Sequence, residues 1–286
     1  MKVGFIGAGK VGTTLGKYFS TRGIEVTGYF SRSIQSAKEA ASFTGSRASG
    51  NADALMELSD VLFLTVPDGE IQKVYSRLDK EKMKGKILCH SSGSLSAGET
   101  FPGIEEQGAY GYSVHPLSAV SDRFTAYREM QDIFFTIEGS EARLDEMRKW
   151  LKSIGLHAAV IDGSKKTLYH AAAVIASNHV VALFAEAQEM LASCGLDEGT
   201  AKDALASLFL GNARHIAEVG PTAALTGPIE RGDSGTAAKH LAAIESEDDR
   251  ELYRLISMRL LKIAKAKHPE RDYSPIEKII KRGIPT

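Results

Sequence analysis

Short apolar runs alternate with amphipathic stretches through the first half of the chain. Strands are predicted at the apolar runs, residues 3–6, 24–30, 61–66, 86–90, 111–115, 133–137 and 157–161. Helices are predicted between them, at residues 13–21, 34–43, 52–58, 71–77 and 141–153. Strands and helices that alternate in this way predict an α/β fold with a doubly wound parallel sheet.

The pattern changes beyond residue 165, where no further strand is predicted. An alanine-rich stretch at 168–193 predicts one long helix that is apolar on most faces, and such a helix is usually buried. Further helices are predicted at residues 196–206, 208–219, 236–244 and from Ser246 onward, and the proline-containing tail from His268 is expected to wrap or fray. We therefore expect two domains, residues 1–163 with the sheet and an all-α domain over residues 164–286.

The first predicted strand runs directly into a glycine-rich turn that opens a helix. Gly7 permits the tight turn, Gly9 lets the backbone approach a pyrophosphate, and Gly12 lets the helix pack close to the strand. Free N–H groups at the helix start then meet the phosphate charge. The turn predicts a Rossmann dinucleotide-binding site, although a glycine-rich turn without a ligand is the alternative. Its predicted cofactor-binding residues are Gly7, Ala8, Gly9, Lys10, Val11 and Gly12.

The end of the second predicted strand indicates which dinucleotide binds. No Asp or Glu lies between Gly28 and Ser33 to accept hydrogen bonds from the ribose of NAD, whereas Arg32 lies between Ser31 and Ser33. A guanidinium suits the 2′-phosphate of NADP, so NADP is favoured over NAD. The alternative is a solvated turn arginine.

The ligand of such a sheet lies at the carboxyl ends of the strands. The residues Val66, Pro67 and Asp68 follow the third strand and are expected beside the ribose and nicotinamide, unless they form a plain turn. Ser91 and Ser92 follow the fourth strand, where substrate contact and a solvated loop are equally open.

His115 ends the fifth predicted strand, directly before Pro116. A histidine at this edge of the sheet can act as an acid or as a hydrogen-bond donor. A hydrogen-bonded structural histidine is the alternative.

The helical domain contains three polar features among apolar residues. His170 and Asn178 lie two turns apart on the long helix, where they either line a cleft or bond to neighbouring backbone. The loop 226–236 holds Arg231, which can face an anionic substrate, and Asp233, which can cap the next helix. A surface turn between helices is the alternative for this loop.

Composition narrows the function classes. The chain has 286 residues and a formal net charge of −1, so no general attraction to nucleic acid or membrane follows. No apolar run is expected to reach the length of a membrane span. Cys89 and Cys194 are far apart and indicate neither a disulfide framework nor a zinc site, so no metal is expected. The start leaves no room for a signal peptide, and a cytoplasmic location is the default.

Motifs along nearly the whole chain resemble those of a family of Rossmann-like oxidoreductases with a helical C-terminal domain of unknown function. This family is similar to ketopantoate reductases, pyrroline-carboxylate reductases and β-hydroxyacid dehydrogenases. Besides the glycine turn, the motifs are residues 90–94, 114–117, 169–173, Asn178, 225–228, 231–233, Thr236 and His240-Leu241.

The resemblance implies roles for several residues. In the wider group a helix of the C-terminal domain brings a lysine, and an asparagine one turn later, to the substrate. Asn178 matches the asparagine, but Val174 stands where the lysine would be, so His170 or His115 would have to replace it. His240 and Asp233 belong to motifs that would lie on the substrate side. The resemblance also implies a homodimer formed through the helical domain.

We therefore expect an oxidoreductase that uses NADPH to reduce the carbonyl group of a small carboxylic acid, with 2-dehydropantoate as the specific substrate. Asn178 would stabilise the negative charge on oxygen, His115 or His170 would deliver the proton, and Arg231 would pair with the carboxylate. An imine is the less favoured substrate. Two other classes stay open, a reductase that links NADP to a deazaflavin and a non-enzymatic NADP-responsive binding protein.

Overall fold

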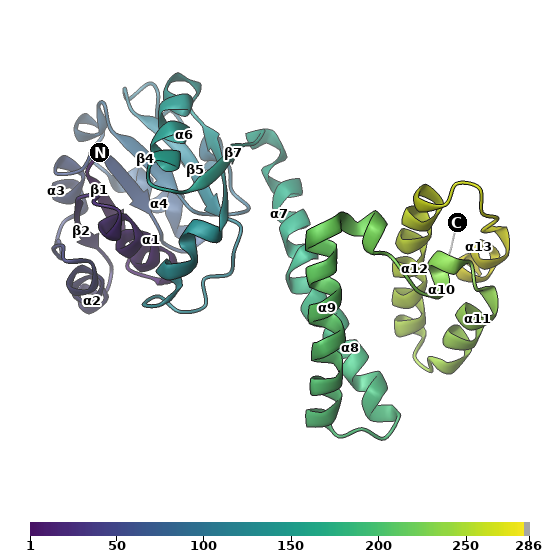
Figure 1. Ribbon diagram of the computed structural model, residues 1–286. Helices are drawn as coiled ribbons and strands as arrows, with labels where there is room; N and C mark the ends of the chain where they lie inside the picture. The colour runs from purple at the N-terminus through teal and green to yellow at the C-terminus, as the bar shows by residue number, and fades with distance from the viewer. Residues whose placement is uncertain (283–286) are drawn as a thin grey trace. The chain divides into compact units, whose positions relative to one another are not determined.

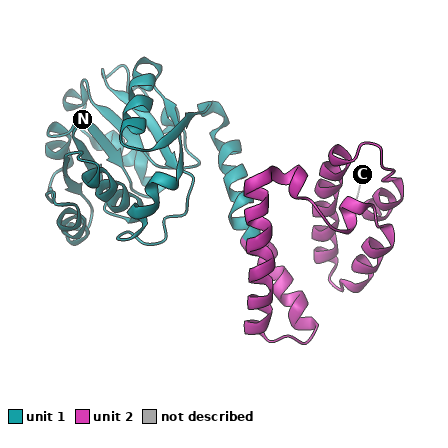
Figure 2. Cartoon of the chain, in the orientation of Figure 1, with its two compact units in different colours: residues 1–180 teal, residues 181–286 magenta. Residues whose placement is uncertain are grey.

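The computed structural model describes residues 1–282, which divide into two compact units at Val180 (Figure 2). The sheet ends at Val160 and the helical region begins at Gly163, the predicted domain boundary. The helical residues 163–180 nevertheless cluster with the sheet in the first unit.

A seven-stranded sheet forms the centre of the first unit, with the strand order β2-β1-β3-β4-β5-β6-β7 (Figure 1). Its strands are β1 (Val3–Ile6), β2 (Val26–Phe30), β3 (Val61–Leu64), β4 (Ile87–His90), β5 (Tyr110–Pro116), β6 (Phe134–Gly139) and β7 (His157–Val160). Strands β1 to β5 run parallel, as predicted, and all seven predicted strands exist.

The prediction of a parallel sheet is wrong at one junction, because β6 runs antiparallel to β5. The only regular element between these two strands is a 3-10 segment, Ala126–Asp132. The chain therefore stays at the edge of the sheet where β5 ends, and β6 begins at that edge. Without a crossover helix the next strand must reverse its direction. Strand β7 then pairs parallel with β6.

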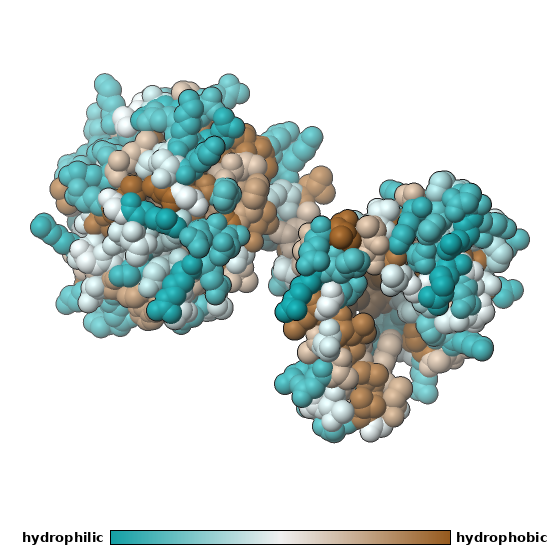
Figure 3. All heavy atoms as spheres, viewed as in Figure 1, coloured by the Kyte–Doolittle hydropathy of each residue, from teal (hydrophilic) through white to brown (hydrophobic). Residues whose placement is uncertain are grey.

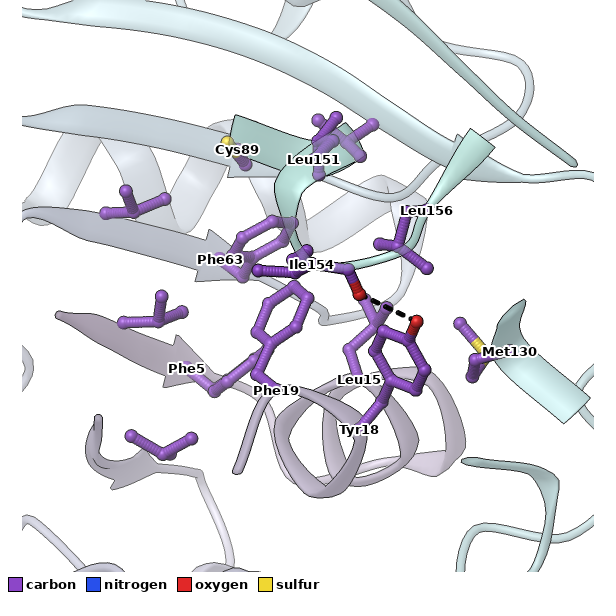
Figure 4. Close-up of a cluster of buried hydrophobic side chains, with 14 of the residues drawn as sticks. Phe5, Leu15, Tyr18, Phe19, Phe63, Cys89, Met130, Leu151, Ile154 and Leu156 are labelled. Atoms are coloured by element: carbon purple, nitrogen blue, oxygen red, sulfur yellow. Dashed lines mark hydrogen bonds between the residues drawn. The ribbon is translucent and has the colours of Figure 1, made fainter. Parts of the chain in front are cut away.

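Helices cover both faces of the sheet (Figure 1). They are α1 (Lys10–Thr21), α2 (Ile34–Thr44), α3 (Ala52–Glu57), α4 (Asp68–Arg77), α5 (Ala97–Thr100) and α6 (Leu144–Ser153). Phe5 of β1 stacks on Phe63 of β3 with ring centroids 5.6 Å apart, and Phe19 of α1 packs on the same rings. The Tyr18 hydroxyl donates to the Ile154 carbonyl at 2.8 Å, which ties α1 to the end of α6 (Figure 4).

The long helix predicted at 168–193 is two helices, α7 (Lys166–Ala176) and α8 (Asn178–Ser193). They break at Ser177, whose hydroxyl bonds back to the Ala173 carbonyl at 2.7 Å. Such a bond competes with the helical ladder and bends helices. The prediction that this stretch is buried is also wrong for the single chain, since Leu168 and Val181 are each 70% exposed.

The same stretch also bears on the prediction that the chain has no apolar run long enough to cross a membrane. The run Gly163–Ser193 is long and apolar enough to cross a membrane by length and composition alone, and none of its most apolar part is buried. The prediction that no apolar run reaches the length of a membrane span is therefore wrong.

The described residues of the second unit form helices joined by loops, with no strand. It continues α8 and adds α9 (Glu198–Ala224), α10 (Pro228–Arg231), α11 (Ser234–Ala243), α12 (Glu247–Lys267) and α13 (Ser274–Lys281). Two helices predicted at 196–219 are one in α9, which kinks at Gly220 before Pro221. Up to residue 282, where the description ends, the predicted tail folds back rather than frays, because Tyr273, Ile276 and Ile280 join the buried core of this unit.

Candidate functional site

The glycine turn between β1 and α1 has the geometry that pyrophosphate binding requires. A Cβ atom at Gly7, where φ is +109°, would lie 2.5 Å from the Thr65 carbonyl oxygen, and one at Gly12 would lie 2.2 Å from the Thr65 hydroxyl. A Cβ at Gly9 would meet nothing within 4 Å. Gly7 and Gly12 therefore serve close packing inside the protein, while the open side of Gly9 faces the space in which a ligand can approach.

The first turn of α1 leaves its backbone amides available. Gly9 precedes the helix without a side chain that could cap it, and the first turn contains no acidic residue. The first bond of the helix runs from the Thr13 amide to the Gly9 carbonyl at 3.0 Å. The amides of Lys10, Val11 and Gly12 precede that bond and can donate to a phosphate. The residues present fit a dinucleotide.

The other predicted cofactor residues occupy the same edge of the sheet. Arg32 is exposed and makes no ion pair within residues 1–282, so its guanidinium is available to an anion. Ser33 caps α2 by accepting from the Ser36 amide at 3.3 Å, which gives its hydroxyl a structural role. Ser31 precedes Arg32 and is partly buried.

Asp68 begins α4 after Val66 and Pro67 and is held by two serines. The hydroxyls of Ser92 and Ser94 donate to its Oδ2 at 2.8 Å and 3.0 Å. These bonds connect the segments that follow β3 and β4. They also show that the Ser92 hydroxyl already has a partner within the protein, the Asp68 carboxylate. The Ser91 hydroxyl is buried and has no hydrogen-bond partner within residues 1–282.

Two predicted histidines come together at the end of β5. The Nδ1 atom of His115 lies 2.7 Å from the Tyr169 hydroxyl of α7. A Cβ atom built on Gly93 would lie 2.8 Å from Nε2 of His115 and 2.7 Å from Cδ2 of His170. His115, His170 and the backbone of the loop after β4 therefore converge on one place, and a side chain at position 93 would force one of the two rings to move.

Burial lowers the pKa of His115 to about 4, and the positive charges of Lys166 and His170 act in the same direction. The prediction that His115 titrates near neutral pH is therefore wrong, because at neutral pH its ring carries no charge. A neutral imidazole still has one N–H, so His115 can donate a hydrogen bond or a proton.

Lys166 is a site residue that the sequence did not reveal. It begins α7, only 2% of it is exposed, and its Nζ donates to the Ser113 hydroxyl of β5 at 2.7 Å. Burial lowers its pKa to about 8, and Glu138 opposes that shift. Its neighbour in the sequence, Lys165, is exposed. Nothing in the local pattern of the sequence shows which of the two lysines is buried.

Asn178 does not join this group. It is exposed at the start of α8, and its Oδ1 accepts from the Ser177 hydroxyl at 3.2 Å. The break at Ser177 removes the regular helical spacing from which a common face with His170 was predicted. Its role as donor to the substrate oxygen stays a prediction.

Three predicted substrate residues belong to the second unit. Arg231 ends α10 and is exposed. Asp233 caps α11, because its Oδ1 accepts from the Thr236 amide at 2.9 Å. The Nδ1 of His240 lies 2.8 Å from the Tyr253 hydroxyl. Asp233 thus has the structural role that the sequence also predicted, and the substrate roles of all three stay predictions.

No group of three or more His, Cys, Asp or Glu residues that could hold a metal ion occurs in the part of the chain that the structure describes.

Two family models match the chain. Residues 2–90 match the family described as NADP oxidoreductase coenzyme F420-dependent, and residues 133–260 match a domain of unknown function, DUF2520. No curated protein matches the chain.

Solved structures match over nearly the full length. A protein from Thermotoga maritima is 29% identical with a TM-score of 0.75, covering 93% of this chain and 99% of that one. A pyrroline-5-carboxylate reductase from Coxiella burnetii is 17% identical with a TM-score of 0.62, covering 93% and 97%. An imine reductase from a Pseudomonas species is 17% identical with a TM-score of 0.60, covering 94% and 88%.

These matches confirm the predicted architecture, a Rossmann-like domain followed by a helical region. The family model of the first domain is that of NADP oxidoreductases, which confirms an NAD(P)-dependent oxidoreductase and NADP as its cofactor at the level of the family.

Proposed function

We propose that this oxidoreductase uses NADPH to reduce the carbonyl group of a small carboxylic acid, with 2-dehydropantoate as the first substrate to test. The observation that carries the proposal is the pairing of His115 with Tyr169 at the carboxyl end of β5, beside the buried Lys166. The glycine turn lies at the same edge of the sheet, because β1 and β5 run in the same direction.

NADPH, when bound, supplies a hydride to the substrate carbon. Charge then builds on the substrate oxygen, and a donor placed at that oxygen lowers the barrier. If Tyr169 donates to Nδ1 of His115, the single proton of the neutral ring lies on Nε2, the atom beside Gly93. His115 is therefore the proposed proton donor, and Tyr169 fixes the tautomer that makes it one. As Nε2 gives its proton to the substrate oxygen, Nδ1 takes the proton of the Tyr169 hydroxyl, so the ring stays neutral and the negative charge comes to lie beside the Lys166 ammonium.

Two other reactions have support from the comparisons. Reduction of an imine is favoured by the pyrroline-carboxylate and imine reductases that share the fold. Hydride exchange with a deazaflavin is favoured by the description of the family that matches residues 2–90. An assay of NADPH oxidation separates these reactions from carbonyl reduction, since each reaction requires a different hydride acceptor: an oxo acid, an imine or a deazaflavin.

The test is oxidation of NADPH with a panel of 2-oxo acids that includes 2-dehydropantoate, next to a cyclic imine and a deazaflavin. We expect turnover with an acid and a loss of about 100-fold or more in kcat for His115→Asn, the range of general acid catalysis. His157 is an exposed histidine on β7, so His157→Asn is the matched control. Full activity of His115→Asn, or turnover with the deazaflavin alone, contradicts the proposal.

We also propose that the chain forms a homodimer through α7, α8 and α9. Leu168, Val181 and Leu208 are each at least 70% exposed in the single chain, and Figure 3 shows hydrophobic residues gathered on the α8–α9 hairpin. Large exposed apolar patches mark interaction surfaces. His170 and Asn178 lie within the same run, and polar groups of this kind suit a protein partner better than lipid.

Sedimentation of the protein without detergent tests this dimer. We expect a dimer for the wild type and a monomer for Leu208→Glu. Leu58, which is 60% exposed on the first unit, provides the control variant Leu58→Glu, which should stay dimeric. A monomeric wild type, or one that requires lipid to stay in solution, contradicts the proposal.

A further inference from the structure

Lys166 is a buried cation without a carboxylate partner in direct contact. Its Nζ donates to the Ser113 hydroxyl at 2.7 Å, and within residues 1–282 it forms no ion pair. The charge of Glu138 raises the pKa of Lys166, but Oε1 of Glu138 already accepts a hydrogen bond from the Ala97 amide at 2.9 Å. Burial also raises the pKa of Glu138, which weakens its negative charge. A buried ammonium in this state is costly and indicates a functional position.

The ammonium lies beside the proposed proton donor. Ser113 and His115 are two residues apart on β5, so their side chains point to the same face of the sheet. Tyr169 follows Lys166 by one turn of α7, and its ring centroid is 5.2 Å from Nζ. The positive charge is therefore placed next to the Tyr169–His115 pair from the inside of the protein.

The charge of Lys166 acts on both histidines at the strand ends. Burial is the main cause that lowers the pKa of His115 and of His90, and the charge of Lys166 is the second in both cases. Asp68 opposes this effect on both rings, and His170 adds to it at His115. Lys166 is therefore the largest charge contribution at both rings, and it disfavours an added positive charge where the substrate is expected to react.

Carbonyl and imine substrates differ in the charge that they bring to this place. A ketone is neutral, and when hydride adds to its carbon the π electrons move to oxygen, which becomes an alkoxide until a proton arrives. A protonated imine carries a positive charge before the reaction and loses it when hydride arrives. A fixed cation favours the first reaction, whose transition state is more negative than its substrate, and disfavours binding in the second.

We propose that Lys166 is a specificity-determining residue whose buried ammonium makes the site prefer carbonyl substrates over protonated imines. This inference rests on the proposed reductase function. Because its Nζ is covered by Ser113 and Tyr169, Lys166 acts through the electrostatic potential at His115 and is a positioning residue.

The test compares two substrates with the same carbon chain and the same carboxylate, 2-oxopentanoate and Δ1-pyrroline-2-carboxylate. For Lys166→Met we expect the ratio of kcat/KM, oxo acid over imine, to fall about tenfold or more, the effect of one pKa unit of charge interaction. Lys166→Arg keeps the charge and should keep most of the ratio. Lys165→Met is the matched control, because Lys165 is exposed, and it should leave the ratio unchanged.

A second measurement does not depend on turnover. NMR titration of the His115 ring should show that its pKa rises in Lys166→Met and stays unchanged in Lys165→Met. A folded Lys166→Met protein whose substrate ratio and His115 titration both match the wild type overturns the inference. If the wild type binds NADPH but reduces neither substrate, the proposed function fails, and the His115 titration alone decides whether Lys166 sets the potential.

Discussion

Alanine at Gly9 should weaken cofactor binding and leave stability unchanged, whereas alanine at Gly12 should destabilise the folded protein. The two glycines lie three residues apart in the same turn, yet only Gly12 is packed against the protein. A Cβ at Gly12 would lie 2.2 Å from the Thr65 hydroxyl and 2.6 Å from the Gly7 carbonyl oxygen. A methyl group at Gly9 would point into open space.

The distances set the expected magnitudes. At Gly12 the backbone oxygen of Gly7 must move, and overpacking of this kind costs about 1–3 kcal/mol. A loss of about 2 kcal/mol corresponds to a melting temperature lowered by about 4–8 °C in a unit of this size. At Gly9 we expect a change within about 0.5 kcal/mol. The same methyl group blocks the approach of the pyrophosphate and should weaken NADPH binding about tenfold or more, or about 1.4 kcal/mol.

Thermal unfolding and calorimetric titration with NADPH measure both effects on the same preparations. Gly50 is a control position, because a Cβ there also meets nothing within 4 Å and the residue lies outside the turn. Gly50→Ala should change neither quantity. The interpretation of the turn is refuted if Gly9→Ala binds NADPH as tightly as the wild type, or if Gly12→Ala is as stable as the wild type.

Three further predictions concern the cofactor, the substrate and acid stability. Arg32→Ala should raise the KM for NADPH about tenfold while the KM for NADH changes little, and equal effects in steady-state assays remove Arg32 as the 2′-phosphate ligand. Arg231→Ala should raise the KM for a 2-oxo acid far more than it lowers kcat, which the same assays measure; an unchanged KM excludes Arg231 as the carboxylate ligand. Burial lowers the pKa of His90 to about 3, so it stays neutral in the folded protein while the unfolded chain binds a proton below about pH 6.5. Stability should therefore fall as the pH decreases from about 6.5 toward 3, by up to about 2 kcal/mol between pH 6.5 and 5. Urea unfolding should show a smaller loss for His90→Asn, and equal losses in both proteins contradict this cause.

The sequence predicted those elements that depend on residues close together along the chain, namely the strands and the glycine turn. The apolar runs became strands, and the glycine turn has the geometry expected of it, because strand length and glycine spacing are properties of adjacent residues. The direction of β6 is different, since alternation along a strand does not encode direction. Only the lack of a helix between Pro116 and Phe134 pointed to the reversal.

The parts of the site that the sequence did not predict depend on contacts between distant residues. Lys165 and Lys166 are equivalent in the local pattern, and only the position of Ser113 on β5 shows which of them is buried. The low pKa of His115 follows from the burial of its own ring and from the charge of Lys166, so it could not be expected from residues 111–117 alone. Apolar composition predicted that α7 and α8 are buried, but composition does not distinguish burial within one chain from burial against a partner, and the single chain leaves them exposed.

Calorimetric titration of the pure protein with NADPH and with NADH is the most direct test of the whole account. The account predicts that NADPH binds, and that it binds more tightly than NADH, because the free amides of α1 can donate to the pyrophosphate and the exposed guanidinium of Arg32 can pair with the 2′-phosphate. Absence of heat from both nucleotides at millimolar concentration would contradict it.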